Sequence, residues 1–138
     1  MAGLQLDAER LRLREIDVSL KEWGRWSSDN ISAGLGLPSA QAWVKVKGRD
    51  IEDFDMQRVE EVEDGYSVWK MVTLASVRGQ QRRHNLQLLF ILKIHYCEAG
   101  NVLDKVHHTA RMFHTSLSRP TYYRRLDEAR RKLATLIY

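Results

Sequence analysis

The chain has 138 residues, of which 43% are hydrophobic and 29% charged, and its formal net charge is +4. This length and balance suit one compact domain, residues 1–138, and exclude a disordered chain. A single cysteine excludes an internal disulfide and a cysteine-rich zinc site. We find no apolar run of membrane-span length and no signal-peptide pattern at the N-terminus, so we expect a cytoplasmic protein without a membrane partner.

The N-terminal part predicts one amphipathic helix followed by a loop. A helix from about Asp7 to Trp26, with Asp7 as N-cap, is indicated by apolar residues at three- and four-residue steps: Leu13, Ile16, Leu20 and Trp23. Residues 27–39, SSDNISAGLGLPS, are rich in turn-forming residues and predict a loop. We leave residues 42–47, AWVKVK, irregular, because a lone strand would have no partner.

The middle of the chain again has helical spacing. The apolar positions are Met56, Val59, Val62, Tyr66, Trp69 and Val72. Gly65 interrupts this series and costs a helix roughly 1 kcal/mol, so one long helix and two short helices both fit the pattern.

The C-terminal third predicts three helices. The first has an apolar stripe from Leu86 to Cys97 and ends at residues 98–100, Glu-Ala-Gly. The second is capped by Asn101 and has Val102, Val106, Ala110 and Phe113 along one side. The third is capped by Ser118 and has a buried stripe of Tyr122, Leu126, Ala129 and Leu133. We therefore predict an all-α domain with an N-terminal helical part, residues 1–82, and a C-terminal helix-turn-helix part, residues 83–138.

Charge is segregated along the chain. Residues 50–64 carry eight acidic side chains against Arg58 alone, whereas residues 119–132 carry six basic side chains against two acidic ones. Such runs are usually solvated helix faces. However, the predicted stripe of the last helix leaves Arg119, Thr121, Tyr123, Arg124 and Arg125 outside the core near its N-terminus, where a recognition helix enters the major groove. This placement favours a DNA-binding helix.

The segment LSRPTYYRRLDEARRKL, residues 117–133, resembles the DNA-reading helix of region 4 of bacterial sigma factors, with Ser, Thr, Arg-Leu and Ala-Arg at matching intervals. Residues 114–116, His-Thr-Ser, replace the family's usual single glycine and lengthen the turn by about two residues. The whole chain is similar to phage antitermination protein Q of the lambdoid type. LKEWGRW, residues 20–26, resembles the family's Trp-Gly-x-Trp stretch, and RHNLQLLFILKIHY, residues 83–96, resembles its helix ending in His-Tyr.

The resemblance implies a protein that binds double-stranded DNA near a phage late promoter and loads onto bacterial RNA polymerase with its sigma factor, in the cytoplasm of the host cell. We expect the DNA contacts to come from Arg119, Pro120, Thr121, Tyr123, Arg124, Arg125 and Arg131. We expect the polymerase contacts to come from Trp26, Glu60 and Glu61, although burial is the more common fate of Trp23, Trp26, Trp43 and Trp69.

Other functions are possible on the same pattern. A repressor or activator with the same helix-turn-helix is the main alternative, and an adaptor that binds only protein is the second. The side chains His95, Cys97, His107, His108 and His114 lack the spacing of a zinc site, so we expect no metal and no cofactor. No phosphate-binding loop or nucleophile motif occurs, and we expect neither an enzyme nor a small-molecule substrate.

Overall fold

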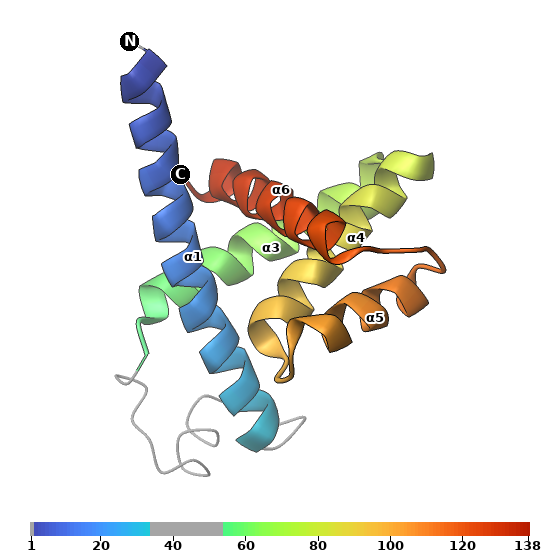
Figure 1. Ribbon diagram of the computed structural model, residues 1–138. Helices are drawn as coiled ribbons and strands as arrows, with labels where there is room; N and C mark the ends of the chain where they lie inside the picture. Colours follow the sequence, from blue (N-terminus) through green and yellow to red (C-terminus); the bar gives the residue numbers. More distant parts are fainter. Residues whose placement is uncertain (1, 34–53) are drawn as a thin grey trace.

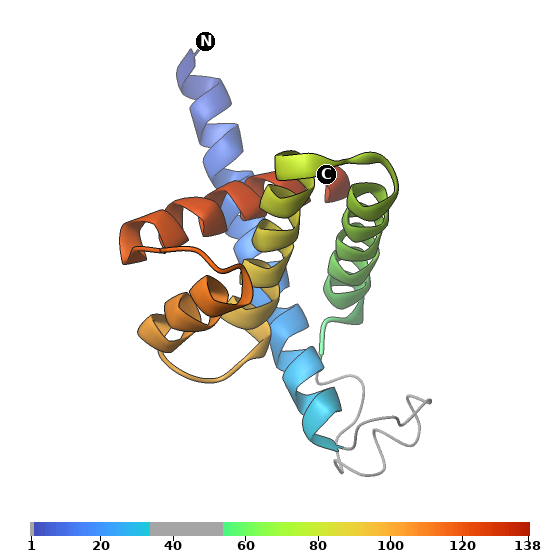
Figure 2. The same ribbon diagram turned by 90° about the vertical axis from the view of Figure 1, so that its right-hand side faces the viewer.

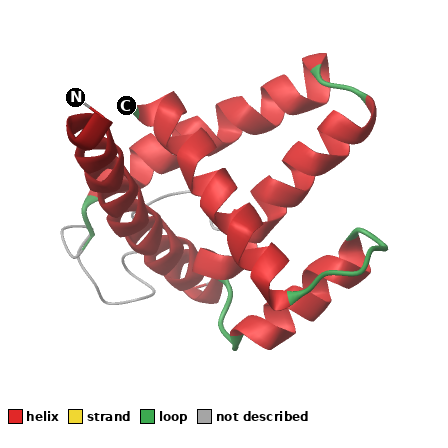
Figure 3. Ribbon diagram, turned by 45° about the horizontal axis from the view of Figure 1, so that its top comes forward, coloured by secondary structure: helices red, strands yellow, loops and turns green. Residues whose placement is uncertain are grey.

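The computed structural model describes residues 2–33 and 54–138, and the regular structure in these two ranges is α-helical (Figure 1, Figure 3). Its helices are α1 (Ala2–Ala33), α3 (Met56–Ser76), α4 (Gly79–Cys97), α5 (Val102–Met112) and α6 (Arg119–Ile137). The predicted all-α class is therefore confirmed. None of the helices described is long and apolar enough to cross a bilayer.

Helix α4 lies in the middle of the arrangement, with α3 on one side and α5 on the other, and α6 crosses behind it (Figure 2). The long helix α1 packs against α3, α4 and α6, and α6 lies across α1, α3 and α4. The first turns of α1 extend beyond the other helices in both views (Figures 1 and 2). The C-terminal half of α6 lies beside α1, and its N-terminal end points away from α1 (Figure 1).

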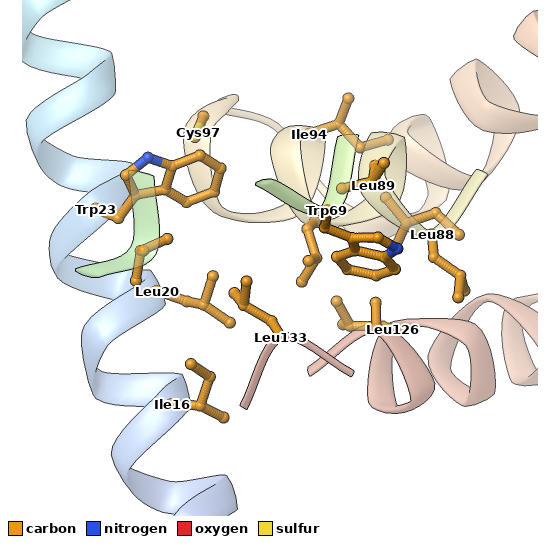
Figure 4. Close-up of a cluster of buried hydrophobic side chains, with 14 of the residues drawn as sticks. Ile16, Leu20, Trp23, Trp69, Leu88, Leu89, Ile94, Cys97, Leu126 and Leu133 are labelled. Atoms are coloured by element: carbon orange, nitrogen blue, oxygen red, sulfur yellow. The ribbon is translucent and has the colours of Figure 1, made fainter. Parts of the chain in front are cut away.

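The core forms where α1, α3, α4 and α6 meet, and Figure 4 shows their apolar side chains pointing toward one another. The predicted stripe of α6 is fully buried, as are three of the four α1 positions: Ile16, Leu20, Trp23, Tyr122, Leu126, Ala129 and Leu133. Trp69 is also buried, and its indole N–H donates to Asn85 Oδ1 at 3.0 Å. Trp26 is half-buried against the core, and Trp43 lies outside the described residues.

The predicted bounds of the first helix are wrong at both ends. The helix begins at Ala2, so Asp7 is an internal residue and no N-cap, which agrees with the good helix-forming residues Ala2, Leu4 and Gln5 that precede it. It also continues through residues 27–33, which we predicted as loop. Ser27 is buried, and the Ser28 hydroxyl donates to the carbonyl oxygen of Cys97 at the end of α4. Packing on α4 thus overrides the weak helix propensity of these polar residues. The remainder of the predicted loop and residues 42–47 lie outside the described range.

The middle segment forms one helix, α3, which runs through Gly65 without a break. Gly65 is buried against α6, and a Cβ atom there would lie 3.1 Å from Ile137 Cγ1 and 3.2 Å from Leu133 Cδ1. The glycine therefore lets α6 approach α3 closely.

One predicted boundary of each of the last three helices is confirmed. α4 ends at Cys97, Asn101 caps α5 by accepting from the N–H of Asp104, and Ser118 caps α6 by accepting from the N–H of Thr121. Residues 113–118 join α5 to α6, which is longer than the three or four residues of the usual motif, and the helix-turn-helix stays a prediction. The boundary that we predicted between residues 82 and 83 falls inside α4.

Helices α1 and α4 approach each other closely at Gly24. A Cβ atom at this position would lie 1.9 Å from the carbonyl oxygen of Tyr96 and 2.6 Å from its carbonyl carbon. Real Cβ atoms do not approach backbone atoms so closely, and a helix backbone cannot move aside as a side chain can. Only glycine therefore permits this crossing.

We predict that Gly24→Ala and Gly65→Ala will differ sharply in stability. Gly24→Ala forces two helix backbones apart and should lower the free energy of unfolding by about 3 kcal/mol or more. Gly65→Ala meets only side-chain ends, and its better helix propensity, worth roughly 1 kcal/mol, should keep it within about 1 kcal/mol of the wild type. Urea denaturation of the three proteins measures both values. A Gly24→Ala protein as stable as the wild type would contradict the close crossing.

Candidate nucleic-acid interface

The N-terminal turns of α6 are held by a contact with α4 and by the N-cap. On the buried side of the helix, the Tyr122 side chain is fully buried and its hydroxyl lies 3.0 Å from His95 Nδ1 on α4. At the N-cap, Ser118 Oγ accepts from the backbone N–H of Thr121 at 3.3 Å and donates to the Thr121 hydroxyl at 2.9 Å. Pro120 occupies the first turn, where its missing N–H costs nothing. The start of the helix is therefore held in place independently of any ligand.

The outward face of these turns is cationic and partly aromatic. Arg119, Pro120 and Arg124 are exposed, Thr121 is half-buried, and the Tyr123 side chain is 44% exposed. Arg124 donates to the Thr121 hydroxyl at 3.3 Å, which holds its guanidinium beside the helix start. Five of the predicted DNA-binding residues thus lie together on the surface of the first two turns.

The other two predicted residues have different surroundings. Arg125 lies on the flank that faces α4, where its guanidinium donates to the side-chain oxygen of Gln87. Arg131 lies near the other end of α6, with ion pairs to Glu9 on α1 at 3.5 Å and to Asp127 at 3.2 Å. The structure brings Arg125 to the edge of the cluster, but it does not bring Arg131 there.

A further arginine reaches this region from α4. Arg83 is exposed, and its guanidinium donates to the carbonyl oxygen of Phe113 in the α5–α6 connection. The neighbouring Arg82 instead donates to the carbonyl oxygens of Leu74 and Val77. Its guanidinium thereby satisfies two carbonyl groups at the C-terminal end of α3. The basic run at residues 78–83 is visible in the sequence, but its distance of about 40 residues from α6 gave no sign that the two segments meet.

The three predicted polymerase contacts come from two different helices. Trp26 is half-buried on α1, whereas Glu60 and Glu61 lie on α3. Glu61 lines an open groove of about 260 Å³ together with Asp64, Gly65, Val68, Leu136 and Ile137. Nearby on α3, the side chains of Val68, Met71 and Val72 are each at least half exposed. This groove lies at the C-terminal end of α6, and 19 residues of helix, about 28 Å, separate it from Ser118.

A polar network joins α6 to α1 and α4. Arg130 donates to the Tyr96 hydroxyl at 2.7 Å, and this hydroxyl donates to Asp17 Oδ1 at 2.7 Å. Burial works to raise the pKa of Asp17, but the hydrogen bond from Tyr96 and the ion pair with Lys21 lower it overall. Beside this network, burial and the charges of Lys105 and Arg130 lower the pKa of His95 to about 4. The His95 ring is therefore neutral at pH 7 and packs against Tyr122 as an uncharged group.

Within residues 2–33 and 54–138, no three His, Cys, Asp or Glu side chains gather in a way that would hold a metal ion. Burial raises the pKa of the Cys97 thiol to about 11, which leaves it protonated and unreactive at neutral pH. Comparison with family models, with curated proteins and with solved structures finds no match for this chain.

We predict that His95 makes the fold less stable as the pH falls from about 6.5 to about 4. In this range the unfolded chain binds a proton at His95 that the folded protein does not bind, so the stability contribution present above pH 6.5 is lost. Because the ring is partly open to solvent, the loss should be about 1 to 2 kcal/mol.

Urea denaturation of wild type and His95→Gln between pH 4 and pH 7 measures this effect. The difference in unfolding free energy between the two proteins should shrink by that amount as the pH falls. A difference that does not change with pH would show that His95 titrates alike in the folded and unfolded chains.

Proposed function

We propose that this chain binds duplex DNA with the first two turns of α6 and that it is a phage late-gene antitermination factor that acts on bacterial RNA polymerase. The observation that carries the proposal is the exposed face of a capped helix start that bears Arg119, Tyr123 and Arg124 and, through residue 126, no acidic side chain.

The chemistry of this face suits DNA in two ways. An arginine fork matches two adjacent acceptors of guanine in the major groove, and it also matches a phosphate. Thr121 and Tyr123 add hydroxyl groups and an aromatic ring at the same helix start. The dipole of α6 adds partial positive charge at the same helix start. Together these groups support a recognition helix.

The antitermination role rests on the resemblance described above and on a second surface. An antiterminator must hold DNA and polymerase together, and the acidic and apolar face of α3 lies at the far end of α6 from the cationic turns. Glu60, Glu61 and Asp64 border the exposed apolar residues Val68 and Met71, which suits a protein partner with basic and apolar side chains. Trp26 remains a proposed contact through its exposed part.

We predict that Arg119→Ala and Arg124→Ala each weaken binding to the cognate DNA site. A contact that reads a base is worth roughly 1 to 3 kcal/mol, about a fivefold to 150-fold rise in Kd. Arg131→Ala serves as the matched comparison in the same helix. Its guanidinium is already paired with two carboxylates, so its removal should cost less. Fluorescence anisotropy with labelled duplexes measures all three values. Unchanged affinity in both Arg119→Ala and Arg124→Ala would exclude these turns as the reading surface.

We predict that reversing the charge of α3, with Glu60→Lys and Glu61→Lys together, impairs readthrough more than DNA binding. Glu61 lines the groove at the C-terminal end of α6, and the length of α6, about 28 Å, is well beyond the screening length of about 8 Å at physiological salt. Readthrough assays and anisotropy on the same protein compare the two activities. A loss confined to DNA binding would contradict a partner surface on α3.

The decisive experiment is transcription in vitro from a cognate late promoter through a terminator, with and without the protein. An antiterminator gives readthrough transcripts only when it is present. Full termination in both reactions, together with normal binding to the promoter DNA, would instead support the repressor or activator alternative.

A further inference from the structure

A polar groove beside α6 is one feature that the proposed function leaves unexplained. It is open, has a volume of about 430 Å³, and lies between the first half of α4, the α5–α6 connection and the start of α6. Its lining residues are Gln80, Arg83, His84, Gln87, Thr115 and Arg125. Two guanidinium groups from different helices therefore face one depression in the surface.

Both guanidinium groups are positioned by the protein and keep donors for a ligand. Arg83 donates one hydrogen bond to the carbonyl oxygen of Phe113, and Arg125 donates one to the side-chain oxygen of Gln87. Gln87 lines the groove and is only 4% exposed. A guanidinium has five N–H donors, so each of these hydrogen bonds leaves most of the fork for a further acceptor. Because the side chains are already ordered, binding an anion costs less conformational entropy.

The carboxylate of Glu128, which contacts the groove residue His84, is already paired. Glu128 on α6 lies 2.8 Å from the ring nitrogen of His84 and 3.5 Å from Lys132 Nζ. Burial works to raise the pKa of Glu128, but the hydrogen bond and charge of His84 lower it overall, so the carboxylate is ionised and paired. The charges of Arg83 and Arg125 are thus not cancelled from this side, and the groove favours an anion.

The position of the groove indicates which kind of anion it binds. Arg125 follows directly after Arg124, so the groove borders the turns that we propose to read DNA. When a helix start enters the major groove, the sugar-phosphate backbone passes along the flank of the helix, where contacts position the protein without reading sequence. We infer that this groove binds a phosphate of the DNA backbone, with Arg83 and Arg125 as its ligands. This inference rests on the proposed function and extends the DNA interface from α6 to α4.

The salt dependence of DNA binding tests the groove directly. Each phosphate contact contributes about 0.9 to the slope of log Kd against log salt concentration, and its loss weakens binding roughly fivefold at 0.15 M salt. Arg83→Gln should lower the slope by about that amount and weaken cognate and unrelated duplexes by the same factor. Arg83→Lys keeps the charge and should retain most of the slope. The exposed Arg14 on α1 is the control, and Arg14→Gln should change neither quantity.

A second pair of variants avoids the contact between Arg83 and Phe113. Gln80→Glu adds a negative charge inside the groove, whereas Gln81→Glu adds the same charge on the same turn outside it. Both changes place a carboxylate in the first turn of α4, where the helix dipole favours it, so neither should lower the melting temperature. Gln80→Glu should weaken DNA binding severalfold more than Gln81→Glu.

The outcomes separate this inference from the proposed function. If the wild type binds duplex DNA but both Arg83→Gln and Gln80→Glu leave its slope and affinity unchanged, the phosphate groove is wrong and the role of α6 stands. If the wild type shows no salt-dependent binding to duplex DNA, both are wrong. Equal losses for Gln80→Glu and Gln81→Glu would indicate a general field effect and would likewise overturn the groove.

Discussion

The close backbone contact between Gly24 of α1 and Tyr96 of α4 is the constraint on which the other packing depends. It brings the backbone of α1 against that of α4 beside the fully buried side chains of Leu20 and Trp23. It also explains why α1 continues past Trp26, because Ser28 then reaches the carbonyl oxygen of Cys97 at the end of α4. Helix α6 then packs against the surface that α1 and α4 form together.

Helix α6 is held on three sides, and this arrangement decides which of its residues are available to a ligand. Arg130 ties it to α1 and α4 through Tyr96 and Asp17, and Gly65 admits it close to α3. Arg125 and Glu128 bond to α4. These contacts cover the buried stripe and hold both flanks of the helix, where Arg125 keeps further N–H donors beside the polar groove. The face left open bears Arg119 and Arg124 near the start and Arg131, paired with carboxylates, near the end.

The sequence predicted what depends on neighbouring residues and missed what depends on distant ones. The caps Asn101 and Ser118 and the stripe of α6 are local patterns, and all were confirmed. The end of α1 was missed because the stabilising contacts of residues 27 and 28 come from α4, about 70 residues away. Gly65 was ambiguous for the same reason, since α6 explains it. Arg83 was absent from the predicted site, because no periodicity reveals that the start of α4 lies beside Phe113.

A rigid α6 has a geometric consequence for the proposed function. The start of α6 bears the cationic turns and borders the polar groove, and its end borders the acidic and apolar groove of α3. Two partners, one at each end, would therefore be held about 28 Å apart in a fixed orientation. Such a link passes no conformational signal, because neither end has to move for the other to bind. Cooperation between DNA and polymerase would then arise from effective concentration alone, since binding one partner raises the local concentration of the other. This form of coupling depends on the spacing of the two surfaces, which the packing of α6 against Gly65 and Tyr96 fixes.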